Sequence, residues 1–321
     1  MIEAILLASA ALAFAAVSGF NDGSTLIALS LPNVALRPLA SIAILVAAVA
    51  LIPLVGGVRV AETLVRGLVS FEGQGGKALF LVAVLVALGV TFALSRRGLP
   101  TSLTLALLGA IVGTGIGRGL PVAWGTVAAV IVVGVAAPLA SGVVGLGVAR
   151  AFALLPRRHV WAEMRALGAL GFLLQSAAYA MNDGQKMIAI LAIALGLGPG
   201  GRVVVAPWSQ LLLGLAFAFG TFLGIERFAR HLGRGVLRIR AIHSVASELA
   251  SAGAVFVSAL LGTPVSTTQA STAAVVGAGA SETIWGIRWE QAARIGAAWA
   301  LTLPTSAVAG ALAAIIVEVV R

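Results

Sequence analysis

Cysteine is absent from this 321-residue chain, and histidine and aromatic residues are scarce. Without cysteine there is no disulfide, no thiolate metal site and no cysteine nucleophile. The three histidines, His159, His231 and His243, lie apart, in or beside arginine-rich connections, which argues against an imidazole metal centre. Aromatic residues make up only 6% of the chain, so the net charge of +10 does not indicate a nucleic-acid-binding protein, which would need stacking aromatics along a basic stripe.

Charged residues are also few, at 10% of the chain, whereas a soluble domain has about 25%. Hydrophobic residues make up 60%, and the mean hydropathy is +1.09. Several apolar runs reach the ~20 residues that span the hydrocarbon core of a bilayer. The composition therefore predicts an all-α polytopic protein of the cell membrane, with the lipid bilayer as its surroundings.

The apolar runs predict about ten membrane segments, which cover residues 2–32, 38–58, 78–95, 99–117, 121–149, 166–198, 206–226, 242–262, 264–281 and 291–318. If the arginine-rich connection 150–165 is cytoplasmic, 14 basic residues fall inside and 6 fall outside. This is the bias toward cytoplasmic positive charge that membrane proteins show. Both termini are then predicted to be extracytoplasmic.

Two short sequence words occur twice, in the same order. Asn-Asp-Gly at 21–23 recurs at 182–184, and Pro-x-Ser-x-Thr at 100–104 recurs at 264–268, with offsets of 161 (182 − 21) and 164 (264 − 100) residues. Five segments precede the connection and five follow it, so the second half must be inverted relative to the first. We predict a first inverted repeat at 1–149, a cytoplasmic linker at 150–165 and a second inverted repeat at 166–321, with broken or re-entrant helices at the words.

The Asn-Asp words hold Asp22 and Asp183, the only two aspartates of the chain. An ionisable side chain at the centre of a bilayer costs about 2.5–3.5 kcal/mol on insertion scales, so two matched copies indicate a function. Each long segment is expected to unwind at its word, which exposes carbonyls beside the side-chain oxygens. Oxygen ligands from Asn21, Asp22, Asn182 and Asp183 suit a hard cation or a proton. A helix-breaking turn at the membrane surface would explain the glycines but not the paired aspartates.

The Pro-x-Ser-x-Thr words have the composition of helix N-termini, where proline is tolerated and hydroxyls stand beside unpaired backbone N–H groups. Two such ends facing each other suit a tetrahedral oxyanion, and simple helix capping is the alternative. The candidate anion ligands are Thr101, Ser102, Thr104, Ser266, Thr267 and Thr268. Lys186 follows Asp183 by three residues and either pairs with it, faces the anion or extends to the membrane surface. Glu248 is a candidate ligand of the coupling cation, or else an interfacial carboxylate.

At these words the chain resembles the PiT family of inorganic phosphate transporters, which are cation–phosphate symporters with both words duplicated in inverted halves. The matching residues are Gly19-Phe20-Asn21-Asp22, Asn182-Asp183-Gly184-Gln185-Lys186-Met187 and the words that begin at Pro100 and Pro264, while the run around Glu248 resembles the family's glutamate-bearing helix. The chain departs from the family pattern at Ser24-Thr25, at Leu103, and at Leu105 and Gln269, where the family has histidine. The first half-site is therefore more apolar than the family pattern implies.

The resemblance implies a transporter rather than an enzyme, one that imports inorganic phosphate with sodium or protons as the coupling ion and without any other cofactor. Asp22 and Asp183 would be the metal ligands if the ion is sodium. Three alternatives stay open: a sulfate permease of the same fold, a passive anion channel, and an intramembrane protease whose two aspartates share a proton. A homodimer stays open as the assembly.

Overall fold

The computed structural model describes residues 2–32, 36–71, 75–96, 101–154, 160–196, 203, 206–232 and 239–320. Over these ranges the chain is helical, and the only β pairing is the isolated bridge between Val69 and Val122. Seven helices in this part of the chain are long and apolar enough to cross a membrane, and α6 is a shorter apolar helix. The prediction of an all-α polytopic membrane protein is confirmed, and the number of crossings stays a prediction.

The helices of the first half begin with a continuous helical path whose middle turn is a π-helix. They are α1 (Ile2–Ser18), η1 (Gly19–Gly23), α2 (Ser24–Ser30), α3 (Pro38–Val55), α4 (Arg59–Glu62), η2 (Thr63–Gly67), α5 (Gly76–Arg96), α6 (Leu103–Gly117) and α7 (Trp124–Ala153). The short helix α4 and the turn η2 lie in a stretch for which the sequence predicted no membrane segment. They are anchored by the buried side chains of Val60 and Leu64.

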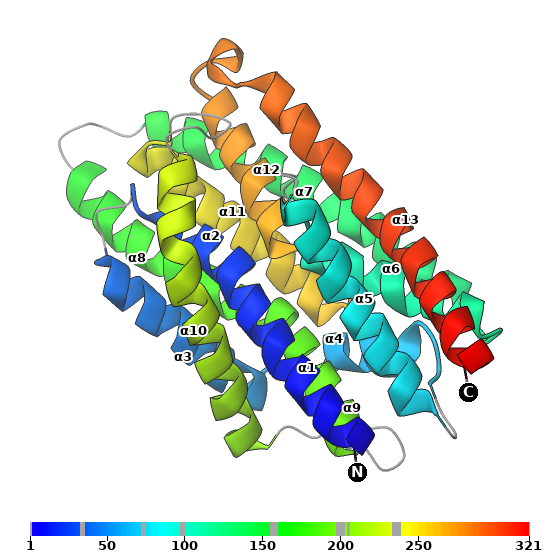
Figure 1. The fold of residues 1–321 in the computed structure, drawn as a ribbon. Helices are drawn as coiled ribbons and strands as arrows, with labels where there is room; N and C mark the ends of the chain where they lie inside the picture. The colour runs from blue at the N-terminus through cyan, green and yellow to red at the C-terminus, as the bar shows by residue number, and fades with distance from the viewer. Residues whose placement is uncertain are drawn as a thin grey trace.

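The second half begins in the same way, with a π-helical turn between two helices. Its elements are α8 (Val160–Tyr179), η3 (Ala180–Gly184), α9 (Gln185–Leu195), α10 (Pro207–Leu232), α11 (Ala241–Leu260), α12 (Thr267–Ala280), η5 (Ile284–Gly286) and α13 (Trp289–Val320). Each of the ten predicted segments coincides with a helix or with a helix–π-turn–helix path. α1 begins and α13 ends at the same end of the bundle, the lower end in Figure 1.

The closest helix contacts use glycine. A Cβ atom on Gly113 of α6 would lie 1.9 Å from the carbonyl oxygen of Ala307 in α13, and one on Gly277 of α12 would lie 1.9 Å from the carbonyl oxygen of Gly142 in α7. Apolar surface gives little drive for helix association in lipid, so backbones that approach closely through small residues supply the packing instead. Gly109, Gly113 and Gly117, spaced four residues apart, line the α6 side of this contact.

Several helix pairs link the two halves of the chain, alongside pairs such as α8–α11 and α5–α6 that lie within one half. α6 packs on α13 and α12 packs on α7, while α10 packs on α1 and α3 packs on α8. Each of these linking pairs joins one helix from residues 1–149 to one from residues 166–321. At the α1–α10 contact a Cβ on Gly220 would lie 1.8 Å from the carbonyl oxygen of Ala16. The two halves of the chain are therefore interlocked.

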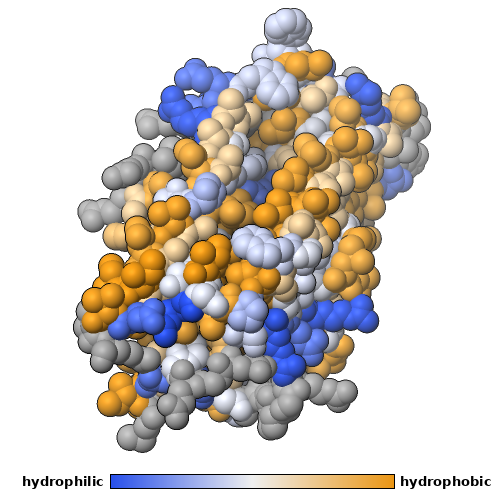
Figure 2. Space-filling model, turned by 90° about the vertical axis from the view of Figure 1, so that its right-hand side faces the viewer, coloured by the Kyte–Doolittle hydropathy of each residue, from blue (hydrophilic) through white to orange (hydrophobic). Residues whose placement is uncertain are grey.

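The outer surface is apolar across its middle. Figure 2 shows hydrophobic residues covering the middle of one face, with hydrophilic residues gathered toward its ends. Large hydrophobic side chains such as Val132, Leu139 and Phe222 are exposed on the surface of the bundle. This distribution is what a bilayer-embedded helical protein requires.

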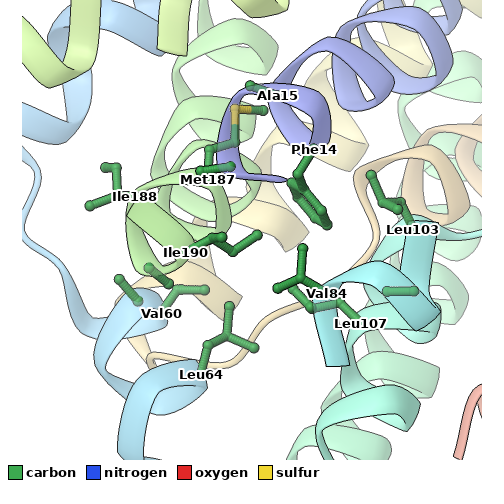
Figure 3. Packing of buried hydrophobic residues seen from close by; sticks show 14 of the residues in the cluster. Phe14, Ala15, Val60, Leu64, Val84, Leu103, Leu107, Met187, Ile188 and Ile190 are labelled. Carbon is green, nitrogen blue, oxygen red and sulfur yellow. The ribbon is translucent and has the colours of Figure 1, made fainter. Parts of the chain in front are cut away.

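The interior is mostly apolar. A large cluster joins α1, α5, α6 and α9 with α4 and η2, and it contains Phe14, Leu64, Val84, Leu107 and Met187. Figure 3 shows these side chains meeting between the helices, with Leu103 at one edge of the cluster. The polar groups described next lie at the margin of this apolar core.

Candidate functional site

Both Asn-Asp-Gly words lie on π-helical turns. Gly19–Gly23 and Ala180–Gly184 each form one such turn between two α-helices, and the flanking residues keep right-handed helical dihedral angles. The interruption predicted at each word is present, but the backbone widens rather than unwinds. Single π-turns inside α-helices are frequent at functional sites, because the extra residue turns neighbouring side chains to a new direction.

The sequence predicted that carbonyls near the first word would be exposed, but the structure shows two of them accepting hydrogen bonds. The hydroxyl of Ser24 donates to the Phe20 carbonyl, and the hydroxyl of Thr25 donates to the Asn21 carbonyl at 2.5 Å. The physical reason is that hydroxyls four residues on can bond back to the helix. The Phe20 and Asn21 carbonyls therefore already accept hydrogen bonds, and the side chains of Asn21 and Asp22 offer further oxygens for an ion.

Asp183 is the centre of a buried polar cluster. Lys186 Nζ lies 2.6 Å from Asp183 Oδ1, and Lys186 is 1% exposed. The hydroxyl of Thr267 donates to Asp183 Oδ2, and the hydroxyl of Thr104 lies 3.5 Å from Oδ1. Of the three arrangements predicted for Lys186, the structure has the pairing with Asp183, and its burial excludes extension to the membrane surface.

All three N–H donors of Lys186 have acceptors. Besides Asp183, they are Thr104 Oγ1 at 2.7 Å and the carbonyl oxygen of Val265 at 2.5 Å. Thr104 belongs to the first turn of α6, and Val265 precedes α12. Lys186 therefore connects the two Pro-x-Ser-x-Thr words, which lie 164 residues apart in the sequence.

Asn182 fixes the chain that leads into α12. Its Nδ2 donates to the carbonyl of Thr263 at 3.0 Å, and its Oδ1 accepts from the backbone N–H of Val265 at 3.1 Å. The neighbouring Gly262 has φ +72°, a left-handed conformation that favours glycine. In this structure Asn182 holds the second Pro-x-Ser-x-Thr word against the π-turn.

The serines of the two words are helix N-caps. Ser102 accepts from the backbone N–H of Leu105 at 3.3 Å, and Ser266 accepts from that of Gln269 at 3.4 Å. The remaining hydroxyls have side-chain contacts: Thr268 with Ser266 at 3.0 Å, and Thr101 with Ser95 at 3.3 Å. Capping thus occurs at both serines, while Thr104 and Thr267 point to Asp183. Pro100 lies outside the described residues.

Asp22 has simpler surroundings. It is 5% exposed, and Asn21 Nδ2 donates to its Oδ1 at 2.8 Å. No salt bridge reaches Asp22 within the part of the chain that the structure describes. Asp22 is nevertheless close enough to interact electrostatically with Asp183 and Lys186. The two aspartates, predicted to share one site, are therefore neighbours.

Glu248 belongs to a second polar group on α11. It is 5% exposed, and its Oε1 lies 3.3 Å from the hydroxyl of Ser244. Its carboxylate lies against Gly171 of α8, where an added Cβ would come within 3.0 Å of Oε2. Glu248 is therefore buried inside the bundle, and its role as a ligand of the coupling cation or as an interfacial carboxylate stays a prediction.

Two residues that the sequence reasoning did not select also belong to this region. Gln185 Oε1 accepts from the backbone N–H groups of Val60 at 2.8 Å and Ala61 at 3.2 Å, which ties α4 to the π-turn. Tyr179 is the only tyrosine of the chain, is fully buried and has Ser18, Asp22 and Asp183 as polar neighbours. A single tyrosine three residues before Asn182 was the available signal.

The described residues include no group of three or more histidine, cysteine, aspartate or glutamate side chains arranged to hold a metal ion. A cation held here would need hydroxyl or amide oxygens in addition to the carboxylates. A helical membrane bundle with a buried, charged site at interrupted helices defines the class of the secondary transporters.

The chain belongs to the phosphate transporter family, whose sequence profile matches residues 18–174 and 156–310. A probable low-affinity inorganic phosphate transporter of Bacillus subtilis (strain 168) is 28% identical over 330 residues, covering 100% of this chain and 98% of that protein. One from Mycobacterium tuberculosis (strain ATCC 25618 / H37Rv) is 35% identical over 317 residues, covering 94% and 74%. The protein is thus similar to transporters and not to enzymes.

A solved structure described as the sodium-dependent phosphate transporter has the same fold. It superposes with a TM-score of 0.82 and covers 100% of both chains, at 17% sequence identity. The resemblance stated from the sequence words is confirmed by the family match, and the all-helical fold is confirmed by this structure.

Proposed function

We propose that this protein imports inorganic phosphate by symport with a cation, through alternating access around the two Asn-Asp and two Pro-x-Ser-x-Thr words. The observation that carries the proposal is the convergence on Asp183 of Lys186 and of first-turn hydroxyls from both α6 and α12. The names of the relatives, probable low-affinity inorganic phosphate transporters, point to the same substrate.

The Asp183 side of the site suits the anion. Lys186 brings a cation to the N-terminal ends of α6 and α12, where backbone N–H groups and the hydroxyls of Thr104 and Thr267 are donors. Because all three Lys186 donors are occupied, an incoming phosphate oxygen replaces one of the present acceptors. The other proposed anion contacts are Thr101, Ser102, Ser266 and Thr268.

The Asp22 side suits the coupling cation. Asp183 is already neutralised by Lys186, whereas Asp22 adds an uncompensated negative charge within electrostatic range of both. With Asn21 beside it, Asp22 offers carboxylate and amide oxygens, which are ligands for sodium and partners for a proton. Glu248, Asn182 and Asp183 complete the proposed set of coupling-ion residues.

The coupling follows from charge. With Asp22, Asp183 and Lys186 ionised, the three side chains carry a net charge of −1, which opposes the entry of an anion into a low-dielectric site. A bound cation removes that opposition, so the loaded site forms more readily than a site with the anion alone. Rocking of the helix pairs around the loaded site then exposes it to the other side.

Uptake of radiolabelled phosphate into proteoliposomes tests the proposal. Sodium and proton gradients are imposed separately, and unlabelled sulfate is offered as a competitor. Accumulation against a phosphate gradient, driven by one of the two ions and not displaced by sulfate, is the expected result. Uptake that only equilibrates phosphate would indicate a channel, and displacement by sulfate would indicate a sulfate permease.

Asp22→Asn and Asp183→Asn variants in the same assay test the site. Both are expected to lower cation-driven accumulation strongly, because each removes one of the two buried aspartate carboxylates. Retention of normal accumulation by both variants would falsify the assignment of the site. Glu290→Gln serves as the matched control, since it removes a carboxylate whose side chain is 85% exposed at the surface of the protein.

A further inference from the structure

The buried face of α11 carries polar groups over more than two helical turns. Ser244, Ser247, Glu248 and Ser251 are each 5% exposed or less. Gln175 of α8 and Ser271 of α12 are equally buried and lie against this face. Serine is common at helix contacts in membranes, but a carboxylate buried on the same face is costly there and indicates a functional role.

These polar groups form a continuous row that starts at the site. Ser271 follows Thr267 by one turn of α12 and donates to Ser251 Oγ at 3.3 Å. Ser251 Oγ in turn lies 2.5 Å from Gln175 Oε1. Further along α11, Ser247 donates to the Ser244 carbonyl at 2.8 Å, and Ser244 contacts Glu248 at 3.3 Å.

The row ends at an ion pair where α11 begins and α12 has ended. Arg240 Nη1 contacts both carboxylate oxygens of Glu282, at 2.7 and 2.8 Å, and His243 Nε2 lies 3.2 Å from Glu282 Oε1. This end of the bundle is the upper end in Figure 1, opposite to the start of α1. If the termini are extracytoplasmic, it faces the cytoplasm.

Two neighbouring side chains of α8 each have a buried donor without an acceptor among the described residues, and one of them, Gln175, belongs to the row. Gln175 Nε2 and Ser176 Oγ are buried and make no hydrogen bond among the described residues. An unsatisfied buried polar group costs about 1–3 kcal/mol, so it is retained where water or a ligand satisfies it in another state. Both groups are donors, which an oxyanion or a water molecule can accept from.

The matching helix of the first half shows that packing does not require these polar groups. With the 164-residue offset of the proline words, Ser244, Ser247, Glu248 and Ser251 correspond to Phe80, Ala83, Val84 and Ala87 of α5. All four α5 residues are fully buried, as their α11 counterparts are. The same positions are thus inward-facing in both helices, but they are apolar in α5 and polar in α11.

We infer that the α11 face, with Gln175 and Ser271, lines a hydrated passage by which the oxyanion moves between Asp183 and the Arg240–Glu282 end. In the present structure the passage is closed, because its residues are buried and the ion pair covers its end. The contact between α5 and its neighbours stays dry. The inference rests on the proposed function for the identity of the solute, but the presence of water is independent of it.

The absence of natural cysteine allows a direct test. Single substitutions Ser247→Cys and Ser251→Cys in α11, and their counterparts Ala83→Cys and Ala87→Cys in α5, are made in the full chain. Each variant in membranes is treated with a water-soluble, anionic methanethiosulfonate, and the rate of modification is measured by mass spectrometry. Modification after denaturation in SDS establishes that every thiol is present and reactive.

The two α11 thiols are expected to react at least ~10-fold faster than the two α5 thiols, because only a hydrated thiolate reacts. Saturating phosphate is expected to slow the α11 reactions. Equal rates in the two helices, or no reaction at either α11 position, overturn the inference. Phosphate uptake by the chain without introduced cysteine is measured in parallel, so a failure of phosphate transport with intact α11 labelling refutes the proposed function and leaves the passage standing.

Glu282→Gln provides a second, independent measurement. It weakens the contact with Arg240 at the end of the row and leaves the residues of the passage unchanged. The Ser251→Cys thiol is expected to react several-fold faster in this background, while the Ala87→Cys thiol is unaffected. An unchanged Ser251→Cys rate shows that the ion pair does not close the passage and overturns that part of the inference.

Discussion

The two Asn-Asp words have the same backbone but different surroundings. Asp183 is contacted by Lys186, Thr267 and Thr104, whereas Asp22 has a hydrogen bond from Asn21. The difference arises at matched positions. Thr25 stands where the second half has Lys186, at the offset of 161, and Leu103 stands where it has Thr267, at the offset of 164.

This comparison shows how a repeat acquires two roles without a change of fold. Leu103 packs into the apolar cluster with Phe14 and Val84, so it supplies packing where Thr267 supplies a hydrogen bond. One half-site is therefore a paired, neutralised carboxylate beside helix N-termini. The other is a carboxylate without a salt bridge among the described residues. The predictions below test whether this difference is as large as the contacts indicate.

Lys186→Met is expected to have the largest effect on stability. It leaves the Asp183 carboxylate buried without its cation, and breaking a buried pair in this way costs about 3–5 kcal/mol. The apparent free energy of unfolding is measured by SDS titration in mixed micelles. Lys77→Met is the matched control, because Lys77 is the only other lysine and its Nζ donates to the Ala194 carbonyl at 3.4 Å, with no carboxylate partner among the described residues. Similar losses for the two variants would contradict the importance of the pair.

Asp22→Asn is expected to change ion coupling rather than stability. The amide can still accept from Asn21, but it removes the charge that we assign to the cation, so the apparent cation affinity should fall by about tenfold or more, equivalent to ~1.4 kcal/mol or more. The measurement is the sodium or proton dependence of phosphate uptake, together with the SDS titration. If Asp22→Asn lowers the free energy of unfolding as much as Asp183→Asn does, the two aspartates contribute equally to stability and the prediction is wrong.

Thr267→Val is expected to lower the free energy of unfolding by about 1.5–3 kcal/mol, the range for a hydrogen bond to a charged group. It preserves the shape of the side chain and removes the donor to Asp183. The measurement is the SDS titration. Thr268→Val is the control, since the Thr268 hydroxyl contacts Ser266 and not the Asp183 carboxylate.

The reverse exchange in the first half, Leu103→Thr, is expected to destabilise the protein by loss of apolar packing without any gain in phosphate uptake. A gain in uptake would show that Leu103 limits the first half-site.

Ser102→Ala and Ser266→Ala are expected to have the smallest effects. Each should lower the free energy of unfolding by about 0.5–2 kcal/mol, because both serines are N-caps. The two losses should be similar, since capping is the feature that both halves share. The same SDS titration measures them. A much larger loss at Ser266 would mean that this serine contributes more to its half-site than a helix cap.

Much of the fold was predictable from the sequence. The apolar runs located all ten helical segments, because a bilayer restricts spanning structures to helices of sufficient length. The duplicated words selected Asp183, Lys186, Thr104 and Thr267, which the structure brings together. Helix α4 was missed because it is only four residues long, and its position depends on Gln185.

The local form of the words was less predictable. The sequence indicated an interruption at each Asn-Asp-Gly, but one π-helical turn takes the place of an unwound segment. At the first word the π-turn is accompanied by hydroxyl donors one turn later and by close glycine contacts with α10, whereas Gln185 and Lys186 follow the second word. The hydroxyl bonds are local, but the contacts of Gly19 and Gly23 with α10 involve residues 198 positions apart (217 − 19 and 221 − 23), so no local pattern encodes them.

The sequence by itself determined that the protein is a membrane-embedded helical bundle with two matched pairs of polar words, because composition and repetition are properties of the chain alone. Tertiary structure decided which members of the words meet. Asp183 was equally able to pair with either Pro-x-Ser-x-Thr word, and only the packing of α6 and α12 around η3 brings both to it. The unequal surroundings of Asp22 and Asp183 follow from that packing, since burial and hydrogen bonding depend on neighbours in space.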